Sequence, residues 1–289
     1  MPNAKDAEAQ AYHRILLVGP TGSGKSSQAF TLPGKKFAYI FDPNSMATLR
    51  GCDLEYERFM PDVMSMDMSL KGFNIDPSTK KPFKGDKPTG KLEPRLWLSW
   101  GDHFNAKYAE GFFKQFDWLI FDSLTFISKC IMDRQLYINN RYGDLEERAD
   151  YRIVGNKMAD VFGTINTMDI NILCTGHIDT YEDEDTKRIR TQLMLPGRAR
   201  KMLPLQFTDI FLSHVVETAD KKGVRYQIRT VPDPRGLQDI RTSMSGLSPE
   251  EDVTIGDGKT APRDVPNPEK WGIGKLIGRN MRQKLAVVR

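Results

Sequence analysis

The sequence predicts an α/β fold in which helices flank a mostly parallel central sheet, followed by a C-terminal antiparallel hairpin. Five short apolar runs have the composition of strands buried on both faces, and helix-forming stretches separate several of them. Strands that alternate with helices favour a parallel sheet, because each crossover places a helix on a face of the sheet. The runs are residues 15–18, 36–41, 118–122, 170–175 and 209–216.

Two segments between these runs have the spacing of helices. Apolar residues from Val154 to Met168 recur three and four positions apart, and residues 124–138 suggest a second helix. Near the C-terminus, residues 224–231 alternate apolar and polar side chains after a turn at 220–223. This alternation predicts an antiparallel hairpin with the run that precedes the turn.

The remaining segments differ from the core in composition. We expect the core to span residues 12–244, with a polar insertion at 61–95 for which a hairpin near 64–75 is one interpretation. Outside this core we expect a flexible tail at 1–11, a linker at 245–268 and a basic C-terminal segment at 269–289.

The composition excludes several classes of protein. With 28% charged and 39% hydrophobic residues, the chain resembles neither a disordered protein nor a coiled coil. Because it has no apolar stretch of roughly 18 residues and no signal or transit peptide, we expect no membrane partner. Three cysteines without metal-binding spacing favour the reducing cytoplasm. A net charge of +4 is compatible with a polyanionic partner but too small to indicate one.

A phosphate-binding loop is predicted between the first apolar run and a short helix expected at about 25–30. The residues, which match G-x-x-x-x-G-K-[ST] with one further serine, are Gly19, Pro20, Thr21, Gly22, Ser23, Gly24, Lys25, Ser26 and Ser27. The glycines let successive backbone N–H groups surround phosphate. Lys25 adds a positive charge at the β- and γ-phosphates, and the Ser26 hydroxyl can coordinate Mg²⁺. The motif therefore predicts ATP and Mg²⁺ as cofactors.

Hydrolysis requires further polar groups at the ends of other strands. Asp122 ends an apolar run about a hundred residues after the loop, and we interpret it as a metal-side carboxylate beside Ser26. The run at 170–175 continues into Gly176 and His177. A polar side chain there could sense the γ-phosphate, and His177 or Thr175 is the candidate.

In this order and spacing, GPTGSGKS, WLIFDS and the CTGH strand end resemble the core ATPase domain of RecA-like recombinases over about residues 12–235. The compact length is similar to that of phage-encoded RecA-like ATPases of the single-strand-annealing type. The resemblance implies a RecA-like P-loop NTPase core, with the sensor strand between the two motif strands. It implies a Mg²⁺-dependent, DNA-dependent ATPase that assists phage DNA recombination, annealing or replication in the cytoplasm of a bacterial host. The implied partners are single-stranded DNA, further copies of the chain in a filament or ring and, as another candidate, a single-strand-binding protein.

The sequence departs from this family at the catalytic base. A glutamate usually follows the second strand, whereas this chain has Asp42-Pro43-Asn44 there. Asp42 is our candidate for the base, and Asn44 could orient water instead. If neither side chain serves, the chain would be a nucleotide-switched binding or assembly protein with slow hydrolysis. A small-molecule P-loop kinase with an arginine-rich lid at 186–201, or a translocating motor, is a further alternative.

The resemblance also places DNA contacts in two loops and a cation in the neighbouring subunit. Candidates for DNA contact are Asn140, Arg141 and Tyr142 in the first loop and Lys187, Arg188, Arg190, Arg198, Arg200 and Lys201 in the second. The second loop begins with an acidic run at 179–185, so a solvated hairpin of mixed charge is the alternative interpretation. Candidates for the cation supplied to a neighbouring site are Lys221, Lys222, Arg225, Arg229 and Arg235.

Overall fold

The computed structural model describes most of the chain. The described residues are 12–60, 93–142, 144–182, 187, 189–219, 221, 223–233 and 236–287. The predicted tail at 1–11, the predicted hairpin near 64–75 and the candidates Arg188, Lys222 and Arg235 lie outside them.

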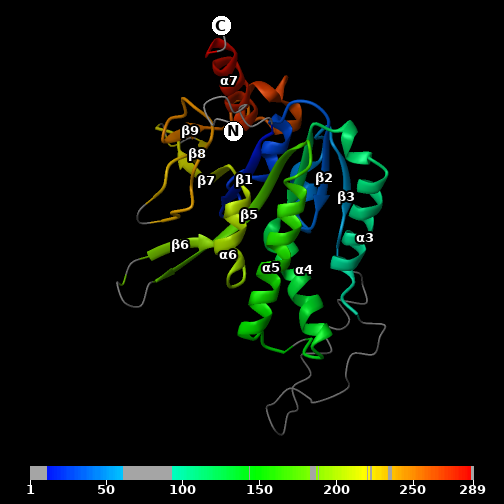
Figure 1. The fold of residues 1–289 in the computed structure, drawn as a ribbon. Helices are drawn as coiled ribbons and strands as arrows, with labels where there is room; N and C mark the ends of the chain where they lie inside the picture. The colour runs from blue at the N-terminus through cyan, green and yellow to red at the C-terminus, as the bar shows by residue number, and fades with distance from the viewer. Residues whose placement is uncertain are drawn as a thin grey trace, which may run out of the picture.

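Within the described residues, nine strands form one sheet in the order β3-β2-β4-β5-β1-β7-β8-β9, with β6 paired to β5 outside this row (Figure 1). The strands are β1 (Arg14–Gly19), β2 (Lys36–Ile40), β3 (Glu55–Arg58), β4 (Trp118–Asp122), β5 (Asn171–Glu182), β6 (Ile189–Leu193), β7 (Asp209–Glu217), β8 (Val224–Arg229) and β9 (Glu250–Asp252). Every pair from β3 to β7 is parallel, whereas β7–β8, β8–β9 and β5–β6 are antiparallel. The predicted α/β fold with a C-terminal antiparallel hairpin is confirmed.

The position of β5 decides how the motifs meet. It lies between β1, which leads into the glycine-rich loop, and β4, which ends at Asp122. Gly19 at the end of β1 is opposite His177 of β5, and Phe121 of β4 is opposite Cys174. Because parallel strands end at the same edge of a sheet, the predicted polar residues gather at the carboxyl edge.

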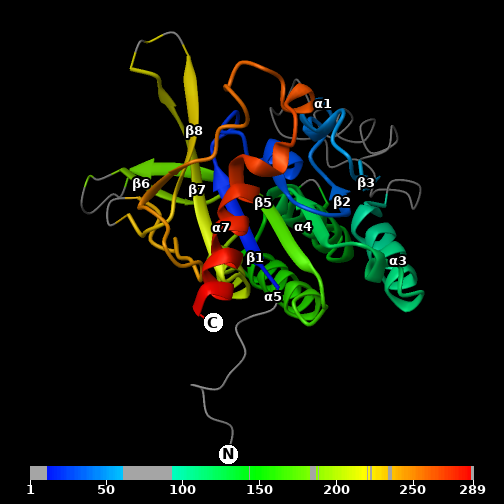
Figure 2. The same ribbon diagram turned by 90° about the horizontal axis from the view of Figure 1, so that it is seen from above.

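Helices cover both faces of the sheet (Figures 1 and 2). On one face, the core contains side chains of α3 (Leu96–Ala109), α4 (Leu124–Ile138) and α5 (Arg148–Ile165). On the other face it contains side chains of η2 (Ser26–Thr31), α1 (Ser45–Leu49) and α7 (Gly272–Val287). The described residues also contain five short helices, namely η4 (Phe112–Gln115), α6 (Ala199–Met202), η5 (Leu203–Gln206), η6 (Pro262–Asp264) and η7 (Pro268–Lys270). No helix among the described residues has the length and apolar character needed to cross a bilayer.

Two β-hairpins extend beyond the carboxyl edge on either side of β1. Where β1 ends at Gly19, its partner β5 continues to Glu182 and pairs with β6, and β7 continues to Glu217 and pairs with β8. Figure 2 shows the β7–β8 hairpin reaching out from the body of the protein. The predicted end of the sensor strand at residue 175 was therefore too early, because its polar continuation pairs with β6 rather than forming a loop.

The sequence suggested a linker at 245–268, but this segment is part of the folded core. Its residues Glu250–Asp252 form β9, which adds to the sheet beside β8, and Val253 and Ile255 are buried. The predicted basic segment that follows contains α7, whose Ile273, Leu276 and Ile277 are buried in the core. The composition predicted a linker and a basic tail because the few apolar residues of these segments are separated by glycines, prolines and charged residues.

The helix after the glycine-rich loop is held by this C-terminal part of the chain. It is a six-residue 3₁₀-helix, η2, close to the bounds expected from the sequence, and it ends there because Pro33 follows and Leu32 is already extended. The buried Gln28 side chain donates to the carbonyl oxygen of Val253 at 3.1 Å and accepts from the backbone N–H of Ile273 at 2.9 Å. These bonds tie η2 to β9 and to α7 at once.

We predict that Gly274→Ala destabilises the protein. A methyl group at this position would clash with the backbone carbonyl oxygen of Thr31 in η2, so α7 and η2 must move apart. The overpacking should cost about 3 kcal/mol and lower the melting temperature by roughly 6 °C in a calorimetric scan.

Gly278→Ala is the matched control in the same helix. Outside its own helix, a methyl group there meets no atom of the described residues within 4 Å, and alanine favours a helix over glycine, so the melting temperature should stay equal or rise slightly. Equal melting temperatures for Gly274→Ala and the unchanged chain would contradict the packing of α7 on η2.

Candidate nucleotide site

The glycine-rich loop is shaped by its own backbone and by the β7–β8 hairpin. Gly22 and Gly24 have φ angles of 81° and 80°, in the region that favours glycine. A side chain on Gly24 would also lie 2.8 Å from the ring of Tyr226, and one on Gly19 would clash with the carbonyl oxygen of Ser213. The Ser213 hydroxyl donates to the carbonyl oxygen of Ser23 at 2.5 Å. The neighbouring strands therefore hold the loop from the side of β7 and β8.

The outer part of the loop is open to solvent, as a ligand site requires. Pro20, Thr21 and Gly22 are exposed, and Ser26 is half-buried at the start of η2. The Ser27 hydroxyl donates to the carbonyl oxygen of Gly24 at 2.8 Å, which uses its proton inside the loop.

Lys25 is a buried cation at the centre of the loop. Its side chain is 6% exposed, and its ammonium group donates to the carbonyl oxygens of Gly19 at 2.9 Å and Pro20 at 2.7 Å. Burial lowers the pKa of Lys25 to about 8, although the nearby carboxylates of Asp122 and Asp42 act in the opposite direction. A phosphate group would give this cation a stronger partner than two neutral carbonyl groups.

Asp122 has the properties expected of a metal-side carboxylate. The residue is 2% exposed, and its Oδ1 atom accepts a hydrogen bond from the Thr175 hydroxyl. Its Oδ2 atom is buried without a hydrogen-bond partner, as is the Ser123 hydroxyl. An unpaired buried carboxylate oxygen is costly unless a ligand satisfies it. Because Mg²⁺ prefers oxygen ligands, the Asp122 carboxylate and the Ser26 hydroxyl fit this ion.

Asp42 and His177 form a pair at the same edge. The backbone N–H groups of Phe41 and Asp42 donate to the carbonyl oxygen of Asp122 at 2.7 and 3.1 Å, which joins the ends of β2 and β4. His177 Nε2 lies 3.6 Å from Asp42 Oδ2, and the His177 backbone N–H donates to the Thr125 hydroxyl at 3.0 Å. The structure thus brings together all four predicted catalytic residues, from the loop, β2, β4 and β5.

The surroundings of His177 favour its neutral form by lowering its pKa. Burial and the positive charge of Lys25 lower the pKa of the imidazole, while Asp42 and Asp122 partly oppose this shift. The Asn44 backbone N–H donates to Asp42 Oδ1 at 2.8 Å, so Asp42 is fixed from both sides. The Asn44 side chain itself is exposed.

Sequence reasoning missed two residues of this site. Tyr226 packs its ring on Gly24, and Ser213 bonds to the loop, but both lie in strands more than 180 residues further along the chain. The alternation in β8 predicted a hairpin, but no local signal indicated that the hairpin borders the glycine-rich loop.

The first group of predicted DNA contacts is largely engaged within the chain. Arg141 pairs with the buried carboxylate of Asp150 and lies 2.9 Å from Glu147, so it stabilises the start of α5. Tyr142 is half-buried, and burial raises the pKa of its hydroxyl. Asn140 is exposed at the end of α4.

The second group does not form one loop, because it is divided between β6 and α6. Lys187 is exposed, with its ammonium group 3.8 Å from Glu182. Arg190 is half-buried on β6, and Arg200 donates to the Gln192 side chain. In contrast, Arg198 and Lys201 are exposed on α6.

Two of the cations considered for a neighbouring site are paired inside the chain. Arg225 lies 2.5 Å from Asp252, and Arg229 lies 2.7 Å from Glu250 and 2.5 Å from Asp233. The pairs with Asp252 and Glu250 cross from β8 to β9 and stabilise the added strand. Lys221 is exposed in the turn between β7 and β8.

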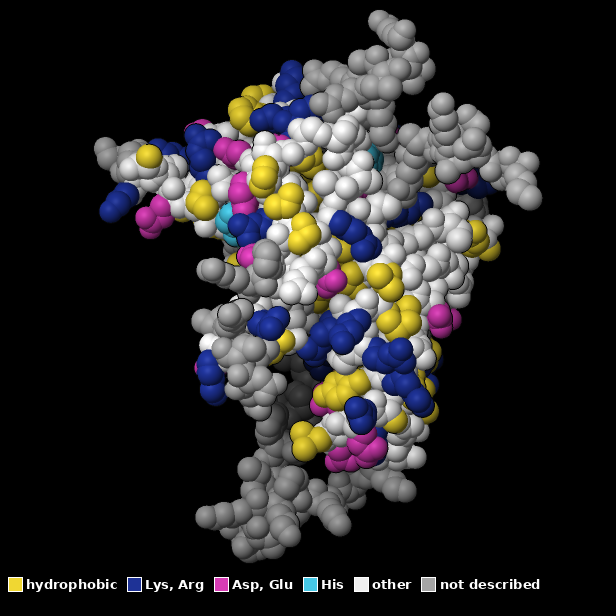
Figure 3. Space-filling model, turned by 60° about the vertical axis from the view of Figure 1, so that its left-hand side comes forward, with side chains coloured by type: hydrophobic (Ala, Val, Ile, Leu, Met, Phe, Trp, Pro, Cys, Tyr) yellow, Lys and Arg dark blue, Asp and Glu magenta, His cyan; other side chains and the backbone are white. Residues whose placement is uncertain are grey.

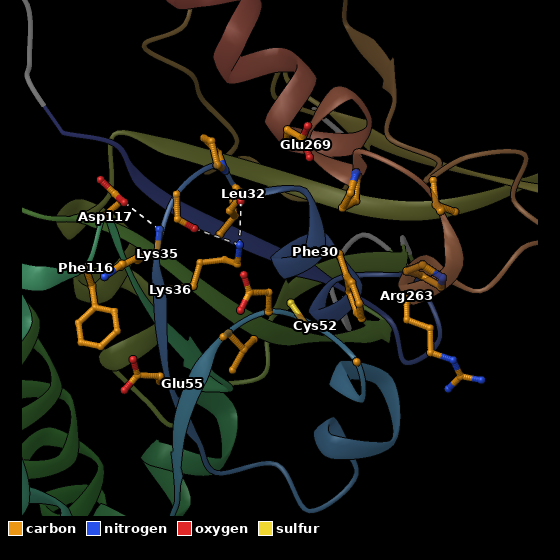
Figure 4. Close-up of a pocket in the computed structure, with 18 residues that line it drawn as sticks. Phe30, Leu32, Lys35, Lys36, Cys52, Glu55, Phe116, Asp117, Arg263 and Glu269 are labelled. Carbon is orange, nitrogen blue, oxygen red and sulfur yellow. Dashed lines mark hydrogen bonds between the residues drawn. The ribbon is translucent and has the colours of Figure 1, made fainter.

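A cavity of about 710 Å³ lies at the opposite, amino edge of the sheet (Figure 4). It is lined by the start of β2, the turn before it and the segment around η6. Two of its charged side chains have partners within the chain: the Lys36 ammonium donates to the carbonyl oxygens of Leu32 and Gly34, and the Asp117 carboxylate accepts from the Lys35 backbone N–H. None of the predicted nucleotide-binding residues lines this cavity.

With β5 inserted between the strand of the glycine-rich loop and the strand of Asp122, the fold is that of a RecA-like P-loop NTPase. The model of a family described as an AAA domain, AAA_24, matches residues 11–237. This chain therefore belongs to that family, and its fold indicates nucleotide binding and hydrolysis.

The chain has distant structural relatives. No curated protein matches it. The flagellar accessory protein FlaH from Methanocaldococcus jannaschii is 13% identical with a TM-score of 0.40, over 85% of this chain and 87% of that chain. The KaiC-like protein PH0186 from Pyrococcus horikoshii OT3 is 12% identical with a TM-score of 0.39, over 87% of this chain and 89% of that chain.

We predict that nucleotide affinity falls as the pH rises above the pKa of Lys25. Phosphate favours the charged ammonium, so binding above about pH 8 must recruit a proton that the free site no longer holds. The Kd for Mg·ADP, measured by calorimetry, should be about tenfold weaker at pH 9 than at pH 7. Lys25→Ala should bind weakly with little change over this range, and a flat profile for the unchanged chain would contradict the prediction.

Proposed function

We propose that this chain binds Mg·ATP in the loop at 19–26, hydrolyses it, and does so as an oligomer on single-stranded DNA during recombination, annealing or replication. The observation that carries the hydrolysis is the meeting of Lys25, Asp122, Asp42 and His177 at one edge of the sheet. Their types and positions supply a phosphate-binding cation, a metal ligand and a candidate base.

Each of these residues has a separate task in the proposed reaction. Lys25 exchanges its two carbonyl bonds for phosphate oxygens, and Ser26 and Asp122 would hold Mg²⁺, which neutralises phosphate charge when bound. Asp42 accepts a proton from the attacking water as the water oxygen bonds to the γ-phosphorus and the bridging P–O bond breaks. His177 holds the Asp42 carboxylate in position and links it to β5.

We expect Asp42→Asn to reduce turnover about 100-fold or more, because the amide cannot accept the proton of the attacking water. The affinity for Mg·ADP should stay within about twofold, since Asp42 is assigned no phosphate contact. Steady-state ATP hydrolysis and calorimetry measure the two effects.

Asp53→Asn is the control for Asp42→Asn, because it removes an exposed carboxylate near the amino-edge cavity without touching the site. The turnover of ATP and the affinity for Mg·ADP should both remain at the level of the unchanged chain. Unchanged turnover in Asp42→Asn would remove this residue from the role of base.

One observation favours a second function, a nucleotide-switched assembly protein with slow hydrolysis. The candidate base is the shorter aspartate, and one of its oxygens already accepts from the Asn44 backbone N–H. Slow hydrolysis would preserve the ATP-bound state and its assembly. Lys221, exposed in the turn of the β7–β8 hairpin, is then the described candidate for a contact between copies.

The DNA partner is supported by two exposed cations at α6, Arg198 and Lys201, which lack a counter-charge among the described residues. We expect ATP turnover to rise severalfold when a thymidine oligonucleotide is added, because ordering on a strand would complete sites between copies. A coupled assay with and without DNA measures this. The recombinase function is wrong if two results are found together. ATP turnover is then the same with and without DNA, and the chain does not bind the oligonucleotide in the presence of a non-hydrolysable ATP analogue.

A further inference from the structure

The outward face of α5 and α6 carries four cations that the chain does not neutralise. Arg148 and Arg152 lie one turn apart on α5 and are exposed, and Arg198 and Lys201 lie one turn apart at α6 and are exposed. Among the described residues, none of the four has a carboxylate partner within ion-pair distance. Nearby Arg141 and Arg200, in contrast, are both bound to side chains of the chain.

Close packing of the two helices places these cations on one surface. A side chain on Gly155 of α5 would lie 2.9 Å from the backbone nitrogen of Ala199, and one on Gly197 would lie 2.6 Å from Tyr151. The helix backbones are therefore nearly in contact, and Arg152 and Arg198 flank this contact. Figure 3 shows the face on which Lys and Arg side chains gather in the lower half, with acidic side chains at its lower end.

The charge of this surface suits an anionic partner. Like charges that share a surface raise the local positive potential, which attracts polyanions. Glu147 is the acidic residue next to Arg148 in sequence, but it pairs with Arg141. Two exposed apolar side chains flank α6 in the sequence: Met194, 49% exposed, directly follows β6, and Leu205, 70% exposed, lies in η5 directly after α6.

We propose that the α5–α6 surface, defined by Arg148, Arg152, Arg198 and Lys201, binds the phosphate backbone of single-stranded DNA. Three of the four residues are arginines. Each guanidinium group can donate two parallel hydrogen bonds to phosphate oxygens. Leu205 and Met194 offer apolar contacts to the sugars and bases of an unpaired strand. Because the cations contact phosphate, the surface does not discriminate base sequence. This inference rests on the DNA binding in the proposed function and names where it occurs.

The test is the salt dependence of DNA binding in the full chain with a non-hydrolysable ATP analogue. Anisotropy of a labelled 30-nucleotide thymidine strand gives the binding constant from 50 to 300 mM NaCl. Arg152→Gln/Arg198→Gln should weaken binding about tenfold or more and reduce the slope of log K against log salt by about 1.4, or about 0.7 for each lost phosphate contact. Melting temperature and Mg·ADP affinity should not change, which shows that the variant is folded.

The matched control is Arg50→Gln/Lys114→Gln, which removes the same charge from exposed positions in other parts of the fold. It should retain the affinity and slope of the unchanged chain. If both double variants lose affinity equally, net charge rather than the α5–α6 surface explains binding, and the inference is overturned.

Two further outcomes separate this inference from the proposed function. If the unchanged chain does not bind the strand, the DNA function itself fails. If the unchanged chain binds and Arg152→Gln/Arg198→Gln has the same affinity and slope, only the assigned surface is wrong. A duplex of equal length should compete less well than the single strand, and stronger competition by the duplex would overturn the assigned partner.

Discussion

Two buried groups of opposite charge, Lys25 and Asp122, are the constraint on which the rest of this structure depends. Both are almost fully removed from water, and neither has an ion-pair contact with the other, so each relies on fixed dipoles or on a ligand. Lys25 takes the carbonyl oxygens of its own loop, and Asp122 takes the Thr175 hydroxyl with one oxygen only. The parallel sheet, the glycines of the loop and the inserted β5 are the means of holding these groups together.

The sequence predicted the parts of this site that short motifs encode. Lys25 and Ser26 follow from the glycine-rich pattern, and Asp122 follows from its place at the end of a buried strand. His177 could be placed because β5 begins as an apolar run with the same composition as β4. Each of these predictions used a local pattern, either the glycine-rich motif or a short apolar run, and the apolar runs correspond to strands that are buried on both faces.

Prediction failed where distant segments determine the structure. The polar half of β5 has the composition of a loop, yet it pairs with β6, and β9 contains only Glu250–Asp252. Pairing with a neighbouring strand supplies the hydrogen bonds that composition does not reveal. The role of Tyr226 could not be predicted for the same reason. Its contact with the glycine-rich loop depends on β7 and β8 passing beside β1.

The ATPase core of this chain extends beyond the part that the family model matches. That match ends at residue 237, but Gln28 in η2 bonds to Val253 and Ile273, and Gly274 packs directly on Thr31. Because η2 begins at Ser26, any displacement of α7 acts on the helix that carries the candidate metal-ligand hydroxyl. The C-terminal segment is thus a structural part of the nucleotide site, and a chain ending near residue 237 would lose the groups that fix η2.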